Sequence, residues 1–235
     1  MPFSRSAHIY DTIYRQSRDY KAQAEQIHSW IQERKPGAVS LLDVACGTGL
    51  HISFLSAWYE VAGVDISPAM LEIARARNPG VTLSIGDMRD FQLNTRFDVV
   101  TCLFSTITYA DTVESLNTTL ANFARHLTPQ GICIVEPFIP PEAWQDGRTG
   151  LRTVESSSKK IAMLDRSERH GRRVRREIAY VVVTPERLEQ IYEEHLFTLF
   201  SRTEYENAFR LAGFDIEFDR KGFIEGRGIY IGTRV

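Results

Sequence analysis

Residues 41–49 read LLDVACGTG, and the architecture of the chain follows from this stretch. An apolar run ends at Ala45 and leads into a turn that contains Gly47 and Gly49. Glycine adopts positive φ without steric cost and lets a ligand approach the backbone closely. In a helix that follows such a turn, the first backbone N–H groups have no partner within the helix. The stretch therefore predicts a strand, a tight turn and a helix, with a ligand site at the turn.

The same unit of an apolar strand and a following helix recurs along the first 137 residues. Strands are expected at about 40–45, 61–65, 81–87, 97–104 and 132–137, and helices at 18–34, after 49, from Ser67-Pro68 onward and around 116–127. The strand segments are apolar without polar alternation, which is typical of a parallel sheet covered by helices on both faces. The fold class is therefore α/β, with a Rossmann-like sheet.

The pattern changes after residue 138. Three β-like segments, at 160–165, 176–184 and 195–200, follow a Pro- and Gly-containing loop, and no helix separates them. From 201 the chain returns to the first pattern, with a capping box at Thr203 and Glu206, a helix that ends at Gly213 and strands at 214–218 and 228–232. We therefore expect residues 1–138 and 201–235 to form one core, and residues 139–200 to form an antiparallel insertion.

Composition excludes several classes of protein. The formal net charge is −2, which gives no reason to expect binding to nucleic acid. No run approaches 18 apolar residues, so no membrane span and no leader segment are expected. The three cysteines lie in strand-like runs without metal-ligand spacing, which indicates a reducing cytoplasm and no metal site.

Two carboxylates follow the next two strands after the glycine turn. Asp65 ends the second strand, where it can accept hydrogen bonds from both ribose hydroxyls of an adenosine. Asp87 ends the third, where it can accept from the exocyclic amine of adenine while the N–H of Met88 donates to the ring. A dinucleotide fingerprint needs a third glycine, but Ile52 stands there. The pattern favours S-adenosylmethionine over NAD.

With these elements in place, the chain resembles the class I S-adenosylmethionine-dependent methyltransferases over residues 40–137. LLDVACGTG is similar to their first motif, and LTPQG at 127–131 is similar to the segment before their fifth strand. The resemblance implies an enzyme that transfers a methyl group from this cofactor to a small molecule.

A narrower resemblance spans nearly the whole chain. YDTIY (10–14), VTCLFSTITY (100–109), EPFIPPE (136–142), HLFTLFSRTEYENAF (195–209) and EGRGIYIG (225–232) are similar to segments of the dTDP-amino-sugar N,N-dimethyltransferases. Those enzymes dimethylate 3-amino-3,6-dideoxyhexoses linked to dTDP, on routes to desosamine and mycaminose. In that family the insertion helps to build the sugar-nucleotide site and a homodimer. The chain departs from the family at Phe138-Ile139, where two tryptophans are usual.

The resemblance also implies a set of site residues. Cofactor contacts are implied for Tyr14, Arg18, Ala45, Gly47, Gly49, Asp65, Ile66, Met70, Asp87, Met88 and Phe104, and acceptor contacts for Ser105, Glu136, Phe138, Arg227 and Tyr230. For Glu136, at the end of the fifth strand, a structural role is equally open. Tyr109 falls where the family places a residue beside the acceptor amine, and we expect it to orient that amine. Arg18 would meet the carboxylate of the cofactor. The forked donors of Arg227 suit a pyrophosphate.

Two other functions stay open from the residues themselves. One is a methyltransferase for a different small amine or a hydroxyl acceptor, and the other is a protein that binds the cofactor without turnover. The basic run at 166–176 is interpreted as a solvated hairpin that turns at Gly171, and His195 as a structural residue on the inner face of the insertion.

Overall fold

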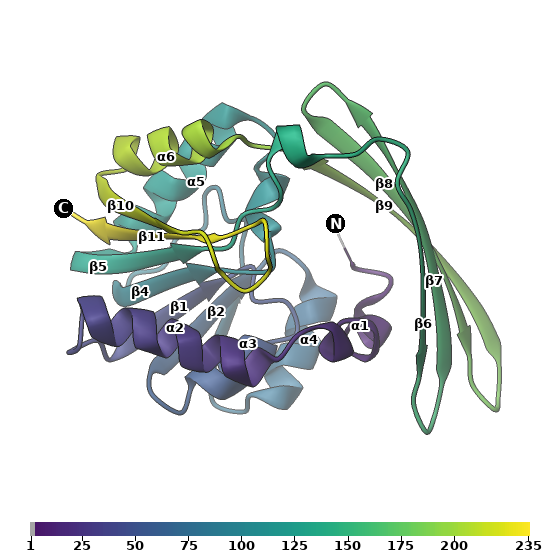
Figure 1. The fold of residues 1–235 in the computed structure, drawn as a ribbon. Coiled ribbons are helices and arrows are strands. Elements are labelled where there is room, and N and C mark those ends of the chain that lie inside the picture. The colour runs from purple at the N-terminus through teal and green to yellow at the C-terminus, as the bar shows by residue number, and fades with distance from the viewer. Residues whose placement is uncertain (1–2) are drawn as a thin grey trace.

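The computed structural model describes residues 3–235, which form two sheets (Figure 1). The first sheet has seven strands in the order β10-β11-β5-β4-β1-β2-β3, and the second has four in the order β6-β7-β8-β9. The strands are β1 (Ser40–Val44), β2 (Glu60–Asp65), β3 (Thr82–Ile85), β4 (Phe97–Cys102), β5 (Leu127–Val135), β6 (Thr149–Glu155), β7 (Lys160–His170), β8 (Arg173–Val183), β9 (Leu188–Thr198), β10 (Phe214–Asp219) and β11 (Ile229–Arg234). The helices are α1 (Ala7–Tyr14), α2 (Tyr20–Arg34), α3 (Leu50–Leu55), α4 (Pro68–Arg77), α5 (Val113–Arg125) and α6 (Arg202–Leu211), with 3₁₀ helices at Arg15–Ser17, Thr106–Ala110 and Pro141–Ala143.

The first sheet is parallel from β1 to β5, and β11 enters it antiparallel to β5. Successive residues of β1 pack into different cores. Leu41 lies in a core with Ala24 and Ile31 of α2, whereas Leu42 lies in a core with α5 and α6. The α/β fold with helices on both faces is therefore confirmed.

The second sheet packs one face against α1. Ile9 and Ile13 of α1 share a core with Met163 of β7 and Tyr180 of β8. In Figure 1, α1 lies between the long strands of this sheet and the rest of the molecule. On the other side of the sheet, several large apolar side chains are exposed: Leu151, Leu164, Leu188, Tyr192 and Leu196. Among residues 3–235, no helix is both long and apolar enough to cross a membrane.

Several local expectations from the sequence need correction. Neither α1 nor β6 was expected, and β5 begins at Leu127 rather than at 132. The predicted strand at 195–200 is the end of β9, which begins at Leu188. The basic run does form a hairpin, with Gly171 between β7 and β8 at a φ of 61°.

The capping box of α6 lies two residues earlier than expected. Ser201, not Thr203, accepts from the N–H of Glu204 through its hydroxyl at 3.2 Å. The Glu204 carboxylate in turn accepts from the Ser201 N–H at 2.8 Å. Ser-x-x-Glu and Thr-x-x-Glu overlap here, and only the first pair has the non-helical cap residue that the geometry needs.

The two candidate caps differ in a measurable way. We expect Ser201→Ala to lower the free energy of unfolding by about 1 kcal/mol, because one N-terminal N–H of α6 loses its acceptor. Thr203→Ala is the matched control and should change it by less than about 0.5 kcal/mol, since Thr203 is exposed. Urea denaturation followed by circular dichroism measures both. A larger loss for Thr203→Ala than for Ser201→Ala would show that the cap is misplaced.

Candidate active site

One cavity of about 930 Å³ lies between the carboxyl ends of the parallel strands and the second sheet. Its wall takes in Gly47 after β1, Asp65 at the end of β2, Asp87 after β3 and Phe104 after β4. From the second sheet it takes in residues such as His195. Ligands of open parallel sheets bind at this edge, so the cavity is the candidate site.

The two glycines of the turn have different tasks. Gly47 has a φ of 55°, and no atom lies within 4 Å of the position that its Cβ would take. Gly49 has a φ of 72°, and its Cβ would lie 2.5 Å from Nδ2 of Asn78. Gly47 therefore leaves open space on the cavity wall, whereas Gly49 allows α3 and α4 to pack. Gly49 is not among the residues that line the cavity.

The first carboxylate, Asp65, is held in place by the backbone. Its Oδ2 accepts from the Gly47 N–H and its Oδ1 from the Ser67 N–H, both at 2.8 Å. Burial raises the pKa of Asp65, and these backbone hydrogen bonds oppose the rise. The strand end thus presents a carboxylate whose direction is already fixed.

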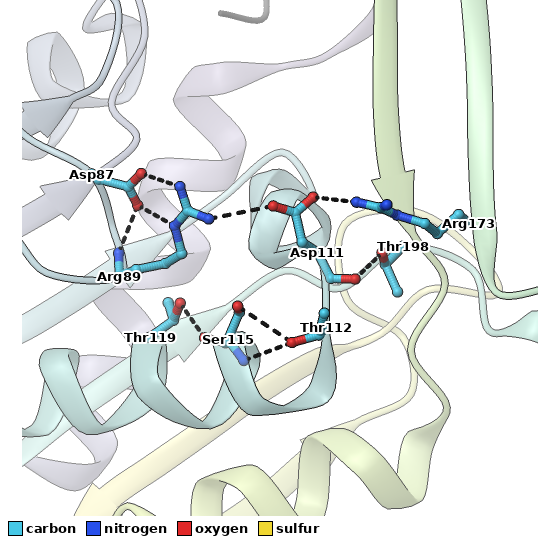
Figure 2. Close-up of polar contacts among 8 residues, drawn as sticks. All are labelled: Asp87, Arg89, Asp111, Thr112, Ser115, Thr119, Arg173 and Thr198. Atoms are coloured by element: carbon cyan, nitrogen blue, oxygen red, sulfur yellow. Dashed lines mark hydrogen bonds and ion pairs between the residues drawn. The ribbon is translucent and has the colours of Figure 1, made fainter.

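The second carboxylate, Asp87, pairs with a residue that the sequence did not single out. Nε of Arg89 donates to Asp87 at 2.9 Å, and this hydrogen bond lowers the pKa of the carboxyl. The other side of the Arg89 guanidinium reaches Asp111 at 3.3 Å. Figure 2 shows two further contacts of Asp111. Its carboxylate accepts from Arg173 of β8 at 3.2 Å, and its backbone carbonyl accepts from the hydroxyl of Thr198. A series of ion pairs thus joins Asp87 to the second sheet.

Glu136 lies behind the cavity wall rather than on it. Its carboxylate is 1% exposed and accepts two hydrogen bonds from Arg18, at 2.7 and 2.9 Å. It also accepts from the N–H of Phe104 at 2.7 Å, and the Arg18 guanidinium lies 4.0 Å from the centre of the Phe104 ring. Glu136 is not on the cavity wall, so the structure gives it a structural role rather than the expected acceptor contact. Its carboxylate holds Arg18 and Phe104, which both line the cavity.

Tyr109 projects from the 3₁₀ helix that follows β4. Its hydroxyl lies 2.8 Å from Nδ1 of His195, and Nε2 of His195 lies 3.4 Å from Glu193. Burial raises the pKa of Tyr109, so the group is a neutral hydroxyl at ordinary pH. The side chain is suited to hydrogen bonding rather than to removing a proton as a phenolate.

Two guanidinium groups on the cavity wall lie over aromatic rings. Arg227 lies 4.6 Å from the centre of the Phe138 ring and donates to Ser105 Oγ at 3.1 Å. Arg148 lies 5.5 Å from the centre of the Trp144 ring. Burial lowers the pKa of Arg227, the Glu136 carboxylate at 3.9 Å opposes this effect, and the positive charges of Arg18 and Arg148 add to it. Arg148 and Arg227 thus place two positive charges on the wall of the cavity, an arrangement that an anion would stabilise.

Most of the predicted site residues meet at this cavity. The lining includes Tyr14, Arg18, Ala45, Gly47, Asp65, Ile66, Met70, Asp87, Met88, Phe104, Ser105, Tyr109, Phe138 and Arg227. Tyr230 is not among them: it is 2% exposed and packs against Tyr205 and Phe218 in the core. Gly49 and Glu136 are the other two that do not line it.

Some lining residues were missed because their signal lies in the period of the antiparallel strands. Arg176 shares the inner face of β8 with the buried Val174, Ile178 and Tyr180, so strict alternation would have pointed to it. His195 lies on the inner face as expected. Trp144 and Arg148 fall in a segment read only as a loop, and no local pattern distinguishes them.

Comparison with known proteins agrees with this geometry. Residues 41–131 match the family model of a methyltransferase domain. The chain is 40% identical over 229 residues to the dTDP-3-amino-3,6-dideoxy-alpha-D-glucopyranose N,N-dimethyltransferase of Streptomyces fradiae, covering 96% of this chain and 89% of that protein. It is also 40% identical to the dTDP-4-amino-2,3,4,6-tetradeoxy-D-glucose N,N-dimethyltransferase of Saccharopolyspora spinosa, covering 97% and 92%.

Solved structures give the same result. DesVI from Streptomyces venezuelae matches with a TM-score of 0.93 and 39% identity, covering 98% of both chains. SAM-bound CalS10, an amino pentose methyltransferase from Micromonospora echinaspora, matches with a TM-score of 0.87 and 36% identity, covering 97% of both. The chain therefore belongs to the S-adenosylmethionine-dependent methyltransferases and, among them, to the family of the dTDP-amino-sugar N,N-dimethyltransferases.

Proposed function

We propose that this enzyme transfers methyl groups to the amino group of a dTDP-linked amino-dideoxy sugar and forms the N,N-dimethyl product. The observation that carries the proposal is the cavity itself. It joins the carboxylates of Asp65 and Asp87 to the guanidinium groups of Arg148 and Arg227, with Tyr109 on the same wall. A simple amine has no phosphate for these guanidinium groups to bind, whereas the pyrophosphate of a sugar nucleotide would accept hydrogen bonds from them.

The cofactor half fits S-adenosylmethionine. Asp65 would accept hydrogen bonds from the ribose hydroxyls, and Asp87 would accept one from the adenine amine. The open space at Gly47 would let the cofactor approach the protein backbone closely. Arg18 has five N–H donors, of which Glu136 takes two, so others remain for the methionine carboxylate. When bound, the cofactor supplies a methyl group on a positively charged sulfur. The residues of this chain hold it in one orientation.

The acceptor half has to deliver a neutral amine in line with that methyl group, about 3 Å away. Tyr109 would accept a hydrogen bond from the amine and orient it. Because no negative charge develops on the acceptor, the reaction needs no oxyanion hole.

The expected homodimer and cytoplasmic location stay predictions; the exposed apolar face of β6 to β9 is compatible with a subunit contact.

The direct test is incubation of the purified chain with labelled S-adenosylmethionine and a panel of acceptors. The panel holds dTDP-3-amino and dTDP-4-amino sugars, the same sugars without the nucleotide, and simple amines. We expect a sugar nucleotide to gain the mass of two methyl groups in mass spectrometry. Methylation of a simple amine or a hydroxyl compound without transfer to any sugar nucleotide would support the alternative acceptors instead. Cofactor binding without any product would indicate a binding protein.

The two strand-end carboxylates predict the loss of cofactor affinity. Asp65→Asn and Asp87→Asn each remove a charged acceptor and should weaken S-adenosylmethionine binding by roughly 10- to 100-fold, as expected for a hydrogen bond to a charged group. Asp215→Asn, at an exposed position of β10, is the matched control. Isothermal titration calorimetry measures all three. Unchanged affinity in both site variants would exclude the proposed adenosine contacts.

The pyrophosphate contact predicts a selective effect on the acceptor. Arg227→Gln should raise KM for the sugar nucleotide by roughly 10- to 100-fold while the affinity for the cofactor stays the same. The exposed Arg220→Gln serves as the control. Arg227→Gln should methylate the sugar without its nucleotide as fast as the wild type does. Equal losses on both acceptors would place Arg227 elsewhere than at the phosphates.

A further inference from the structure

A buried hydrogen-bond chain runs behind the tyrosine that faces the acceptor. It joins Tyr109 to His195 at 2.8 Å and His195 to Glu193 at 3.4 Å. His195 is 2% exposed and Glu193 is 7% exposed. We infer that Glu193 and His195 are positioning residues that fix the Tyr109 hydroxyl as a hydrogen-bond acceptor toward the amine. The inference rests on the proposed function, because it names the task of Tyr109 at that site.

The direction of the chain follows from Glu193. Its Oε1 accepts from the N–H groups of Arg5 and Ser6, at 2.9 and 3.1 Å, and its Oε2 accepts from the Ser6 hydroxyl at 2.8 Å. Burial alone would raise the pKa of Glu193, but hydrogen bonds from His195 and from this N-terminal segment lower it. An ionised carboxylate can only accept hydrogen bonds. The atom that faces it, Nε2 of His195, must therefore carry the proton.

The tautomer of His195 then sets the direction of the Tyr109 hydroxyl. A neutral imidazole that is protonated at Nε2 has a lone pair at Nδ1, so it accepts at that nitrogen. The only proton of the Tyr109 hydroxyl points to His195, and the oxygen is left with lone pairs for the cavity. The other charged groups near His195 are already paired, since Arg176, opposite it in β8, donates to Asp165 at 3.0 Å.

A Tyr109 oxygen that can only accept hydrogen bonds from the cavity determines both the orientation of the amine and the number of methyl transfers. A primary amine has two N–H donors and a monomethyl amine has one, so either can donate to Tyr109 and turn its lone pair elsewhere. A neutral dimethyl amine has no N–H and cannot make this hydrogen bond. The first transfer breaks the methyl–sulfur bond and leaves a monomethyl ammonium, which must lose one proton to water before its nitrogen can accept a second methyl group. The arrangement therefore supports two transfers and gives no help to a third.

Glu193→Gln is the most informative variant because it keeps the shape and reverses the chain. Its amide oxygen can still accept from Arg5 and Ser6, while its NH₂ group donates to Nε2 of His195. His195 then carries its proton on Nδ1 and donates to Tyr109, whose own proton turns into the cavity and binds the lone pair of the amine. Glu189→Gln makes the same change on the same strand, next to His8 of α1 and away from His195, and is the matched control.

The kinetic result expected is unusual. Glu193→Gln should lower kcat at least about tenfold further than Tyr109→Phe does, since a misdirected donor is worse than none. The double variant should return to the rate of Tyr109→Phe. Losses that simply multiply in the double variant would overturn the inference, because Glu193 would then act only by holding α1. Glu189→Gln should leave kcat unchanged.

A second measurement needs no acceptor. Nitrogen-15 NMR of the histidine rings, assigned with His195→Gln, should show His195 protonated at Nε2 only in the wild type and at Nδ1 in Glu193→Gln. A wild-type ring with its proton on Nδ1, or on both nitrogens, would overturn the inference. If the wild type methylates no sugar nucleotide, the proposed function fails, and the NMR result still decides the direction of the chain.

Discussion

The buried carboxylate of Glu136 is the charge around which both halves of the site are arranged. A carboxylate taken out of water is costly unless it is paired and hydrogen-bonded, and breaking such a pair leaves an uncompensated charge. Glu136 meets this need with Arg18 from the segment before α2, with the N–H of Phe104 after β4 and with Arg227 at 3.9 Å. Three segments far apart in the sequence therefore have to converge at the end of β5. Their convergence brings Arg18, Phe104 and Arg227 together on the wall of one cavity.

The second sheet is tied to this frame by polar contacts as well as by its core. Asp111 connects Arg89, which pairs with Asp87, to Arg173 of β8. It does so from a left-handed backbone conformation, with a φ of 64°, that a non-glycine residue adopts only when its surroundings hold it there. Glu193 of β9 fixes the N-terminal end of α1, whose Tyr14 lines the cavity. Residues from both sheets that line the cavity thus belong to one connected network.

The sequence predicted which residues meet at the carboxyl ends of the parallel strands, because their positions there are encoded locally. Strand ends and a turn with positive φ place Gly47, Asp65 and Asp87 at one edge, whatever the rest of the chain does. The helix α1 was missed because its eight residues are too few to be stable alone, and packing on β7 and β8 supports it. Tyr230 was misplaced because alternation along β11 turns it toward α6, which no reading of the EGRGIYIG segment reveals. Trp144 and Arg148 meet Phe138 and Arg227 only once the chain has folded.

Burial favours orientation, rather than proton transfer, as the task that we propose for Tyr109. A phenol whose pKa is raised keeps its proton, and a protonated phenol cannot take another from an ammonium group. The amine must therefore be neutral when it is methylated, and the protein contributes by choosing which way its lone pair points. A hydroxyl can choose only if its own proton has a fixed place. In this fold the proton of the Tyr109 hydroxyl lies on the hydrogen bond to the imidazole of His195, which the carboxylate of Glu193 orients. The direction of a single hydrogen bond at the site therefore depends on a charge that does not contact the substrate.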